Sequence, residues 1–139
     1  MLTEVSRTGI KHLPFDTIFD GFSKGDFMYL YVELWKARSA WIELSREERE
    51  SWFDNLLASL QEQLQSGVEP LGFARNDEDT PLAAGYDFIG VWRMPNKDIA
   101  VQFEKFVDQA GWHAYFEQVN VRGPILEIEA FSSTHIGMG

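Results

Sequence analysis

Two helix-start signals, each lying between segments of alternating apolar residues, constrain the fold of this chain more than any other feature. Ser45 is followed three residues later by Glu48, the capping-box pattern with which a helix begins. Asn96 is placed to cap a second helix. Each helix carries an apolar stripe at helical spacing, and a glycine ends it, Gly67 for the first and Gly111 for the second. The chain therefore contains two helical crossovers.

Four segments beside these helices have the composition of strands. Residues 29–35, YLYVELW, alternate strictly, and the segments VEPLGFARN, YDFIGVWRM and EQVNVR follow in order. Pro70 cannot donate to a strand ladder, so it favours an edge position for the second strand. Gly90 marks a point in the third strand where a backbone or a ligand can approach closely. The tail ILEIEAF also alternates and predicts a short fifth strand.

The order strand–helix–strand–strand–helix–strand predicts an α+β fold of the ferredoxin-like, split βαβ type. Right-handed crossovers give a four-stranded antiparallel sheet in the spatial order 4-1-3-2, with both helices on one face. We expect this domain to span residues 27–123. A C-terminal extension covers 124–139. An N-terminal extension covers 1–26 and contains a short helix, because PFDTIFDGF places its apolar residues on one helical face.

The helices leave one face of the predicted sheet uncovered. We expect that face to carry the aromatic half of the first strand, Tyr29, Tyr31 and Trp35, together with Glu33. An exposed apolar patch of this size marks a partner or ligand site. The simplest way to cover the face is a second copy of the chain, sheet against sheet.

Composition excludes several classes of partner and site. The net charge of −10 argues against nucleic acid and against an anionic membrane surface as partners. The absence of cysteine excludes disulfides, thiolate metal sites and cysteine nucleophiles. The three histidines have no short ligand spacing, and NDED at 76–79 lacks the calcium-loop pattern, so we expect no metal and no cofactor. The N-terminus has no signal-peptide core, and we expect a cytoplasmic protein.

Three segments resemble a known group of proteins. YVELWKARSAWIELSREERE, AGYDFIGVWRMP and AGWHAYFEQVN are similar to an uncharacterised bacterial family of the dimeric α+β barrel superfamily, over about residues 28–123. WIELSREER also resembles the helix entry of darcynin-like proteins. The resemblance implies a homodimer whose two sheets face each other. Superfamily members include cofactor-free oxygenases, isomerases, haem-dependent enzymes and binding proteins, so the fold does not select a chemistry.

Glu33 is the first candidate catalytic residue. In a functional interpretation, desolvation in an aromatic box raises its pKa and makes it a usable general base. In a structural interpretation, Glu33 pairs with Arg93 or Arg122, because both lie on strands predicted to flank the first strand. Of these two interpretations, we favour the ion pair.

His113 is the second candidate, because it is the histidine inside the predicted domain. It forms an i, i+4 pair with Glu117 if the WHAYFE segment is helical, and it is then suited to act as an acid, a base or a ligand. The alternative is a surface or interface histidine flanked by Trp112 and Tyr115.

Three functions remain open on the sequence alone. The first is a homodimeric protein that binds a small, partly apolar or aromatic molecule beside the sheet. The second is a cofactor-independent oxygenase or isomerase in which Glu33 or His113 moves a proton. The third is a structural or interaction protein without a ligand. The expected ligand-binding residues are Tyr29, Tyr31, Trp35, Tyr86, Trp92, Arg93 and Arg122.

Overall fold

The computed structural model describes residues 28–139. Its first half contains β1 (Tyr29–Ala37), α3 (Ser39–Ile42), α4 (Arg46–Gln65) and β2 (Glu69–Arg75). Its second half contains β3 (Phe88–Met94), α5 (Lys97–Gln109), α6 (Trp112–Tyr115), β4 (Phe116–Pro124) and α7 (Ile128–Ile136). The expected N-terminal helix of residues 1–26 lies outside the described residues.

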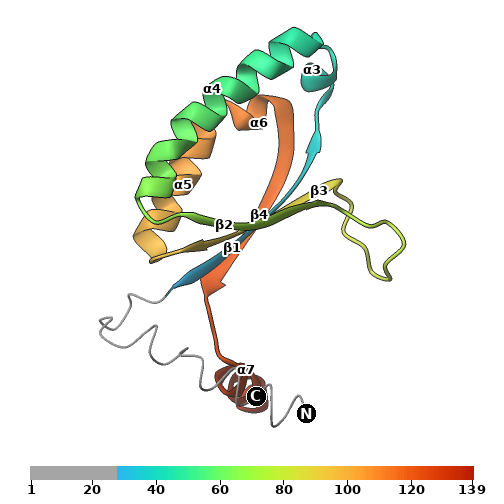
Figure 1. The fold of residues 1–139 in the computed structure, drawn as a ribbon. Helices are drawn as coiled ribbons and strands as arrows, with labels where there is room; N and C mark the ends of the chain where they lie inside the picture. The colour runs from blue at the N-terminus through green and yellow to red at the C-terminus, as the bar shows by residue number, and fades with distance from the viewer. Residues whose placement is uncertain (1–27) are drawn as a thin grey trace.

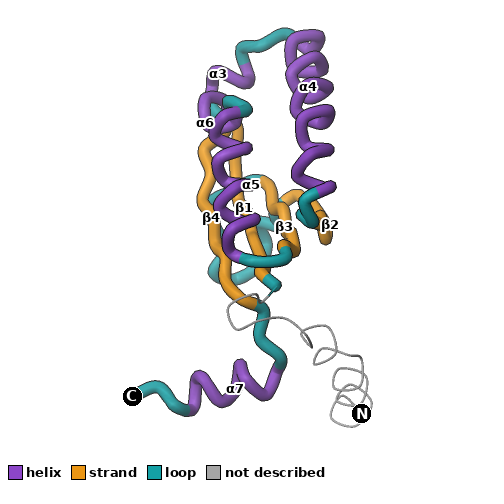
Figure 2. The backbone as a smooth tube through the Cα atoms, turned by 90° about the vertical axis from the view of Figure 1, so that its left-hand side faces the viewer, coloured by secondary structure: helices purple, strands orange, loops and turns teal. Residues whose placement is uncertain are grey.

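The four strands form one antiparallel sheet in the order β2-β3-β1-β4. This is the predicted order, and it confirms the ferredoxin-like α+β fold. Pro70 lies on β2, which is an edge strand as expected. Helices α4, α5 and α6 lie on one side of the sheet, and α7 lies beyond its other side (Figures 1 and 2).

Local signals determine where both long helices begin and end. Ser45 Oγ accepts a hydrogen bond from the backbone N–H of Glu48 at 3.1 Å, and the Glu48 side chain accepts one from the Ser45 N–H at 2.8 Å. Asn96 Oδ1 accepts from the N–H of Ile99 at the start of α5. Gly67 (φ +106°) and Gly111 (φ +85°) adopt the left-handed conformation that glycine tolerates best. The predicted caps are therefore confirmed.

The core lies between the sheet and α5. Phe103 of α5 is 2% exposed, and its ring contacts the rings of Tyr31 and Trp92 at centroid distances of 5.6 and 4.8 Å. Met94 and Ala100 are completely buried beside them. Burial of large side chains at this density is the main source of stability of a small domain. The α5 face of the sheet is thus its packed face.

This packing contradicts the predicted assignment of the two sheet faces. Tyr31 and Glu33 are buried beneath the helices, at 1% and 6% exposure, and do not lie on the open face. The aliphatic half of β1 occupies the open face instead, and Leu30 is 40% exposed. Tyrosine and glutamate carry polar tips that need hydrogen-bond partners, and the helix side supplies these partners.

The C-terminal tail also differs from its prediction. Residues 128–136 form helix α7, whereas alternation in ILEIEAF had predicted a strand. Glu127 occupies the N-cap position with extended backbone, and the chain turns into a helix directly after it. No helix among residues 28–139 combines the length and the apolar character needed to cross a bilayer.

Candidate functional site

Glu33 is the buried charged residue around which the candidate site is built. It lies in the middle of β1, directly opposite Gly90 on β3 and Asn120 on β4. Its diagonal neighbours on the same face are Phe88 and Trp92 on β3, and Gln118 and Arg122 on β4. Diagonal neighbours on one face of a sheet are within reach of long side chains.

Two neutral donors hold the Glu33 carboxylate. Trp92 donates its indole N–H to Glu33 Oε1 at 2.8 Å, and Gln118 Nε2 donates to Oε2 at 2.9 Å. Gln118 Nε2 also donates to Asn120 Oδ1, while Gln118 Oε1 accepts from the indole N–H of Trp112 at 2.7 Å. The carboxylate therefore belongs to a hydrogen-bond network that orients both of its oxygens.

The favoured ion pair of Glu33 is absent from the structure. Arg93 lies opposite Leu30 on the open face, where it donates to Glu69 Oε1 at 2.6 Å. Arg122 donates to Glu104 Oε2 at 2.7 Å. No ion pair described for residues 28–139 includes Glu33.

Burial without a cation changes the ionisation of Glu33. Desolvation raises the pKa of this carboxyl above its usual range, and the hydrogen bonds from Trp92 and Gln118 oppose the rise without cancelling it. A carboxyl in this state holds its proton at a higher pH than an exposed glutamate does. A rise in pKa is the direction of shift that suits a carboxyl to general acid or base catalysis.

A second polar cluster lies next to the Glu33 network on the same face of the sheet. The Tyr31 hydroxyl donates to Glu104 Oε2 at 3.1 Å, and the same oxygen accepts from Arg122. Burial is the main cause that raises the pKa of Tyr31, with the charges of Glu104 and Glu33 adding to it. Tyr31 therefore stays protonated, and the cluster ties β1 and β4 to α5.

Aromatic rings surround Glu33 on the helix side. Trp35 stacks on Phe88 at 5.8 Å and meets Trp112 edge-on at 5.5 Å. A Cβ atom placed on Gly90 would come within 3.1 Å of the Trp35 ring and 3.3 Å of the Phe73 ring. The missing side chain at Gly90 thus allows both rings to lie directly over the sheet, so aromatic side chains, and not the expected backbone or ligand, approach closely at this position.

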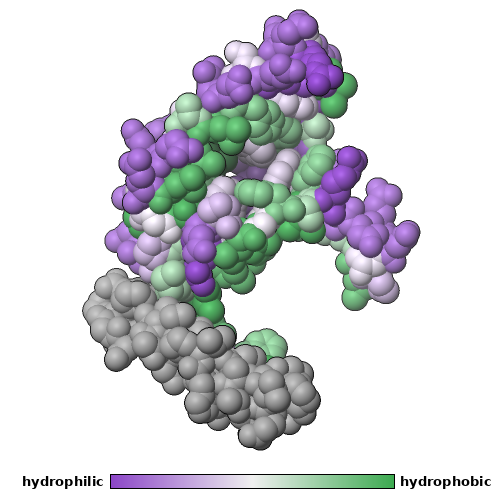
Figure 3. Space-filling model, in the orientation of Figure 1, coloured by the Kyte–Doolittle hydropathy of each residue, from purple (hydrophilic) through white to green (hydrophobic). Residues whose placement is uncertain are grey.

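The space between α4 and the sheet is incompletely filled. Helix α4 lies over the sheet, yet none of its twenty residues is fully buried. Phe73, on the helix side of edge strand β2, is 60% exposed. Figure 3 shows the hydrophobic side of α4 turned toward the sheet, with a hollow between the two. We call this space the α4 hollow.

One polar atom within the helix layer lacks a hydrogen bond. Gln63 Oε1 is buried and has no partner among the described residues. Gln63 lies on α4 between Leu60 and Leu64, both of which pack against the core. A buried polar atom without a partner needs an explanation such as an ordered water or a ligand.

The remaining predicted site residues occupy different places. Tyr29 packs against the core cluster, and Tyr86 is half-buried beneath the Lys36 ammonium at 5.5 Å. His113 lies on α6, where its backbone carbonyl accepts from Arg38 Nε at 3.0 Å. Helix α6 ends at Tyr115 and Glu117 belongs to β4, so the expected helical pair of His113 and Glu117 does not form.

Sequence reasoning missed the partners of Glu33 and of Tyr31. Gln118 and Asn120 are short polar residues in an alternating strand, and nothing in their own spacing marks them. Glu104 lies on the polar side of a predicted helix and resembles a solvated residue. The register between strands is the signal that would have identified Gln118, because it places Gln118 diagonal to Glu33.

Two cavities are described, and neither contains Glu33. One has a volume of about 590 Å³ and lies on the open face between the sheet and α7. The other, of about 350 Å³, lies beside the turn that follows β2 and is lined mainly by acidic residues. Within residues 28–139, no cluster of histidine, aspartate and glutamate is arranged to hold a metal ion.

The chain is similar to a family of unknown function and to several solved structures. The model of a family of unknown function, DUF6616, matches residues 28–138. Curated proteins give no match. A dimeric ferredoxin-like protein of unknown function from Thermobifida fusca YX is similar at 16% identity, covering 76% of this chain and 97% of that chain, with a TM-score of 0.37.

Proposed function

Because the chain belongs to DUF6616, a family of unknown function, we propose from the geometry that it binds a small, partly apolar or aromatic molecule in the α4 hollow. Glu33 forms the polar end of this site. The burial of a carboxylate without a cation is the observation that carries the proposal, since such a group is costly unless it serves a purpose.

The surroundings of Glu33 support a ligand with an apolar body and one hydrogen-bonding group. Phe73 and Trp35 offer ring faces, and the apolar side of α4 lies across from them. Ligand sites typically combine such apolar walls with a few oriented polar groups. The unpaired oxygen of Gln63 is a further polar group on the helix side of the layer.

Small aromatic probes test this site directly. We expect phenol, aniline or indole to shift the indole N–H resonances of Trp35 and Trp92 in a two-dimensional NMR spectrum, because these rings border the hollow. The Glu33→Gln variant is expected to bind the best probe about tenfold or more weakly, the effect of one lost charged hydrogen bond.

Glu117→Gln is the matched control, because Glu117 is exposed in β4 and lies on the other face of the sheet. This variant should bind like the wild-type chain. The proposal fails if the probes leave the indole resonances unchanged, or if Glu33→Gln and Glu117→Gln bind equally well.

A second candidate function is proton transfer by Glu33 in an isomerase or a cofactor-independent oxygenase. The raised pKa of the buried carboxyl favours it. His113 lies outside the hydrogen-bond network of Glu33, so this candidate rests on Glu33 alone. Unchanged turnover of a verified substrate by Glu33→Gln would remove it.

We further propose that two copies pair through the open sheet face in a homodimer. The observation behind this proposal is the aliphatic character of that face, since Val121 is 63% exposed and Val119 39%. A structural role without a ligand, and the darcynin-like resemblance of the segment that enters α4, stay predictions.

A further inference from the structure

The C-terminal helix α7 has an apolar surface that the rest of the described residues, 28–127, leave exposed. Ile128 and Phe131 are 56% and 54% exposed, and Ile136 is 81% exposed. The helix lies apart from the rest of the domain, and the Ile125 N–H, which donates to the Met28 carbonyl at 2.9 Å, holds the segment leading to it (Figure 1). We call residues 125–138 the C-terminal arm.

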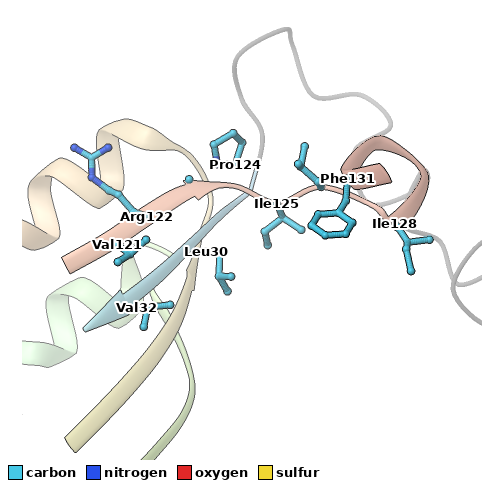
Figure 4. A pocket seen from close by; sticks show the side chains of 10 residues that line it. Leu30, Val32, Val121, Arg122, Pro124, Ile125, Ile128 and Phe131 are labelled. Carbon is cyan, nitrogen blue, oxygen red and sulfur yellow. The ribbon is translucent and has the colours of Figure 1, made fainter. Parts of the chain in front are cut away.

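The arm and the open sheet face form two walls of one concavity. The cavity of about 590 Å³ has Leu30, Val32 and Val121 on its sheet wall, and Ile125, Ile128 and Phe131 on its arm wall. Figure 4 shows these side chains around the cavity, while the Arg122 side chain points away from it. Both walls are apolar, and the concavity is open to solvent.

The low charge of the open face is compatible with a second copy of the chain as the occupant. A net charge of −10 opposes self-association, so two copies can meet only where the contact surface itself carries little charge. The charged residues on the open face lie away from its centre and have opposite charges beside them: Arg93 bonds Glu69, and Lys36 faces Glu117 across the strands. Two copies can therefore meet at the centre of this face without burying a charged side chain.

The combined area of the open sheet face and the arm also agrees with a dimer interface. Strands of seven to nine residues at a spacing of about 4.8 Å present a face of roughly 500 Å². A stable interface needs about 800 Å² from each partner. The sheet face alone falls short, and the exposed apolar side of the arm is the surface that makes up the difference.

We propose that the C-terminal arm is exchanged between two copies, so that α7 of each chain packs against the open sheet face of its partner. This inference rests on the proposed homodimer and adds its geometry. In a dimer with two-fold symmetry, one interface buries both the sheet face and the arm of each chain. Such an interface is isologous, because both chains contribute the same surface.

Sedimentation equilibrium of the full chain measures the contribution of the arm. The wild-type chain should be a dimer, and Ile128→Ser with Phe131→Ser should weaken dimerisation about 100-fold, because two apolar side chains lose their burial. Val121→Asp should yield monomers. Leu82→Ser is the control, because Leu82 is fully exposed in the turn before β3 and should not change the dimer.

Crosslinking tests which parts of two chains meet. The native chain contains no cysteine, so a mixture of Ile128→Cys and Val121→Cys chains can join arm to face only between molecules. A short bismaleimide should give an arm–face crosslink that mass spectrometry identifies. A Leu82→Cys chain mixed with Val121→Cys should not give the equivalent product.

The outcomes separate the arm from the dimer. A wild-type dimer that the arm substitutions leave unchanged, while Val121→Asp dissociates it, overturns arm exchange and keeps the sheet-face dimer. A wild-type monomer at micromolar concentration overturns both.

Discussion

Phe103→Ala is expected to lower the free energy of unfolding by about 3–5 kcal/mol, the usual cost of removing a buried phenylalanine ring. Phe103 is 2% exposed and lies against Tyr31, Trp92 and Phe106. A small domain has a total stability of roughly 5–15 kcal/mol, so the loss is a large part of it. Urea unfolding followed by tryptophan fluorescence measures the change.

Phe73→Ala is the matched control for this prediction. It removes the same ring from the edge strand, where the side chain is 60% exposed. We expect a loss of about 1 kcal/mol or less, as for an exposed apolar contact. Equal losses in the two variants would contradict the assignment of the core to the layer between α5 and the sheet.

Glu33→Gln is expected to remove a specific part of the pH dependence of stability. Burial raises the pKa of Glu33 in the folded chain above its value in the unfolded chain. At a pH between these two values, the folded chain therefore binds more protons than the unfolded chain. Wild-type stability therefore falls as the pH rises through this interval, by up to about 1.4 kcal/mol per pH unit. The stabilisation that comes from the raised pKa of Glu33 is fully present at a pH below the pKa that Glu33 has in the unfolded chain.

The amide variant has no proton to lose at this position. The amide also leaves one hydrogen bond of the Glu33 network unmade, and this cost does not depend on pH. The stability difference between wild type and Glu33→Gln should thus decrease with pH and then become constant. A difference that is constant or increases with pH for Glu33→Gln would contradict the buried state of Glu33.

The sequence was sufficient to predict the elements and their order because the signals for them are local. The capping box at Ser45, the asparagine at 96 and the glycines at 67 and 111 each act within one turn of a helix. Strand order then followed from the handedness of the crossovers. These features do not depend on side chains that are distant in the sequence.

The choice between the sheet faces was not local, and the prediction was wrong. In YLYVELW one alternating half is aliphatic and the other is mainly aromatic, so period two does not show which half meets the helices. Side-chain chemistry decides instead. The Tyr31 hydroxyl and the Glu33 carboxylate require partners, and Glu104, Trp92 and Gln118 supply them.

A shift of one residue in the register between the strands would change the hydrogen-bond partners of Glu33. Arg93 and Trp92 are neighbours in the sequence, yet one lies on the open face and the other donates to Glu33. The prediction of a strand in the C-terminal tail was wrong for a related reason. A segment of seven residues such as ILEIEAF fits both a helix and a strand, and its surroundings decide between them.

The ionisation of Glu33 in the native chain tests the central claim most directly. A ¹³C NMR titration of the Glu33 side-chain carboxyl, assigned by its loss in Glu33→Gln, gives the pKa of this single group. The structure predicts a midpoint above 4.5, the value for an unperturbed glutamate. A midpoint at or below 4.5 would show that Glu33 is solvated or paired with a cation, and would contradict the proposed site.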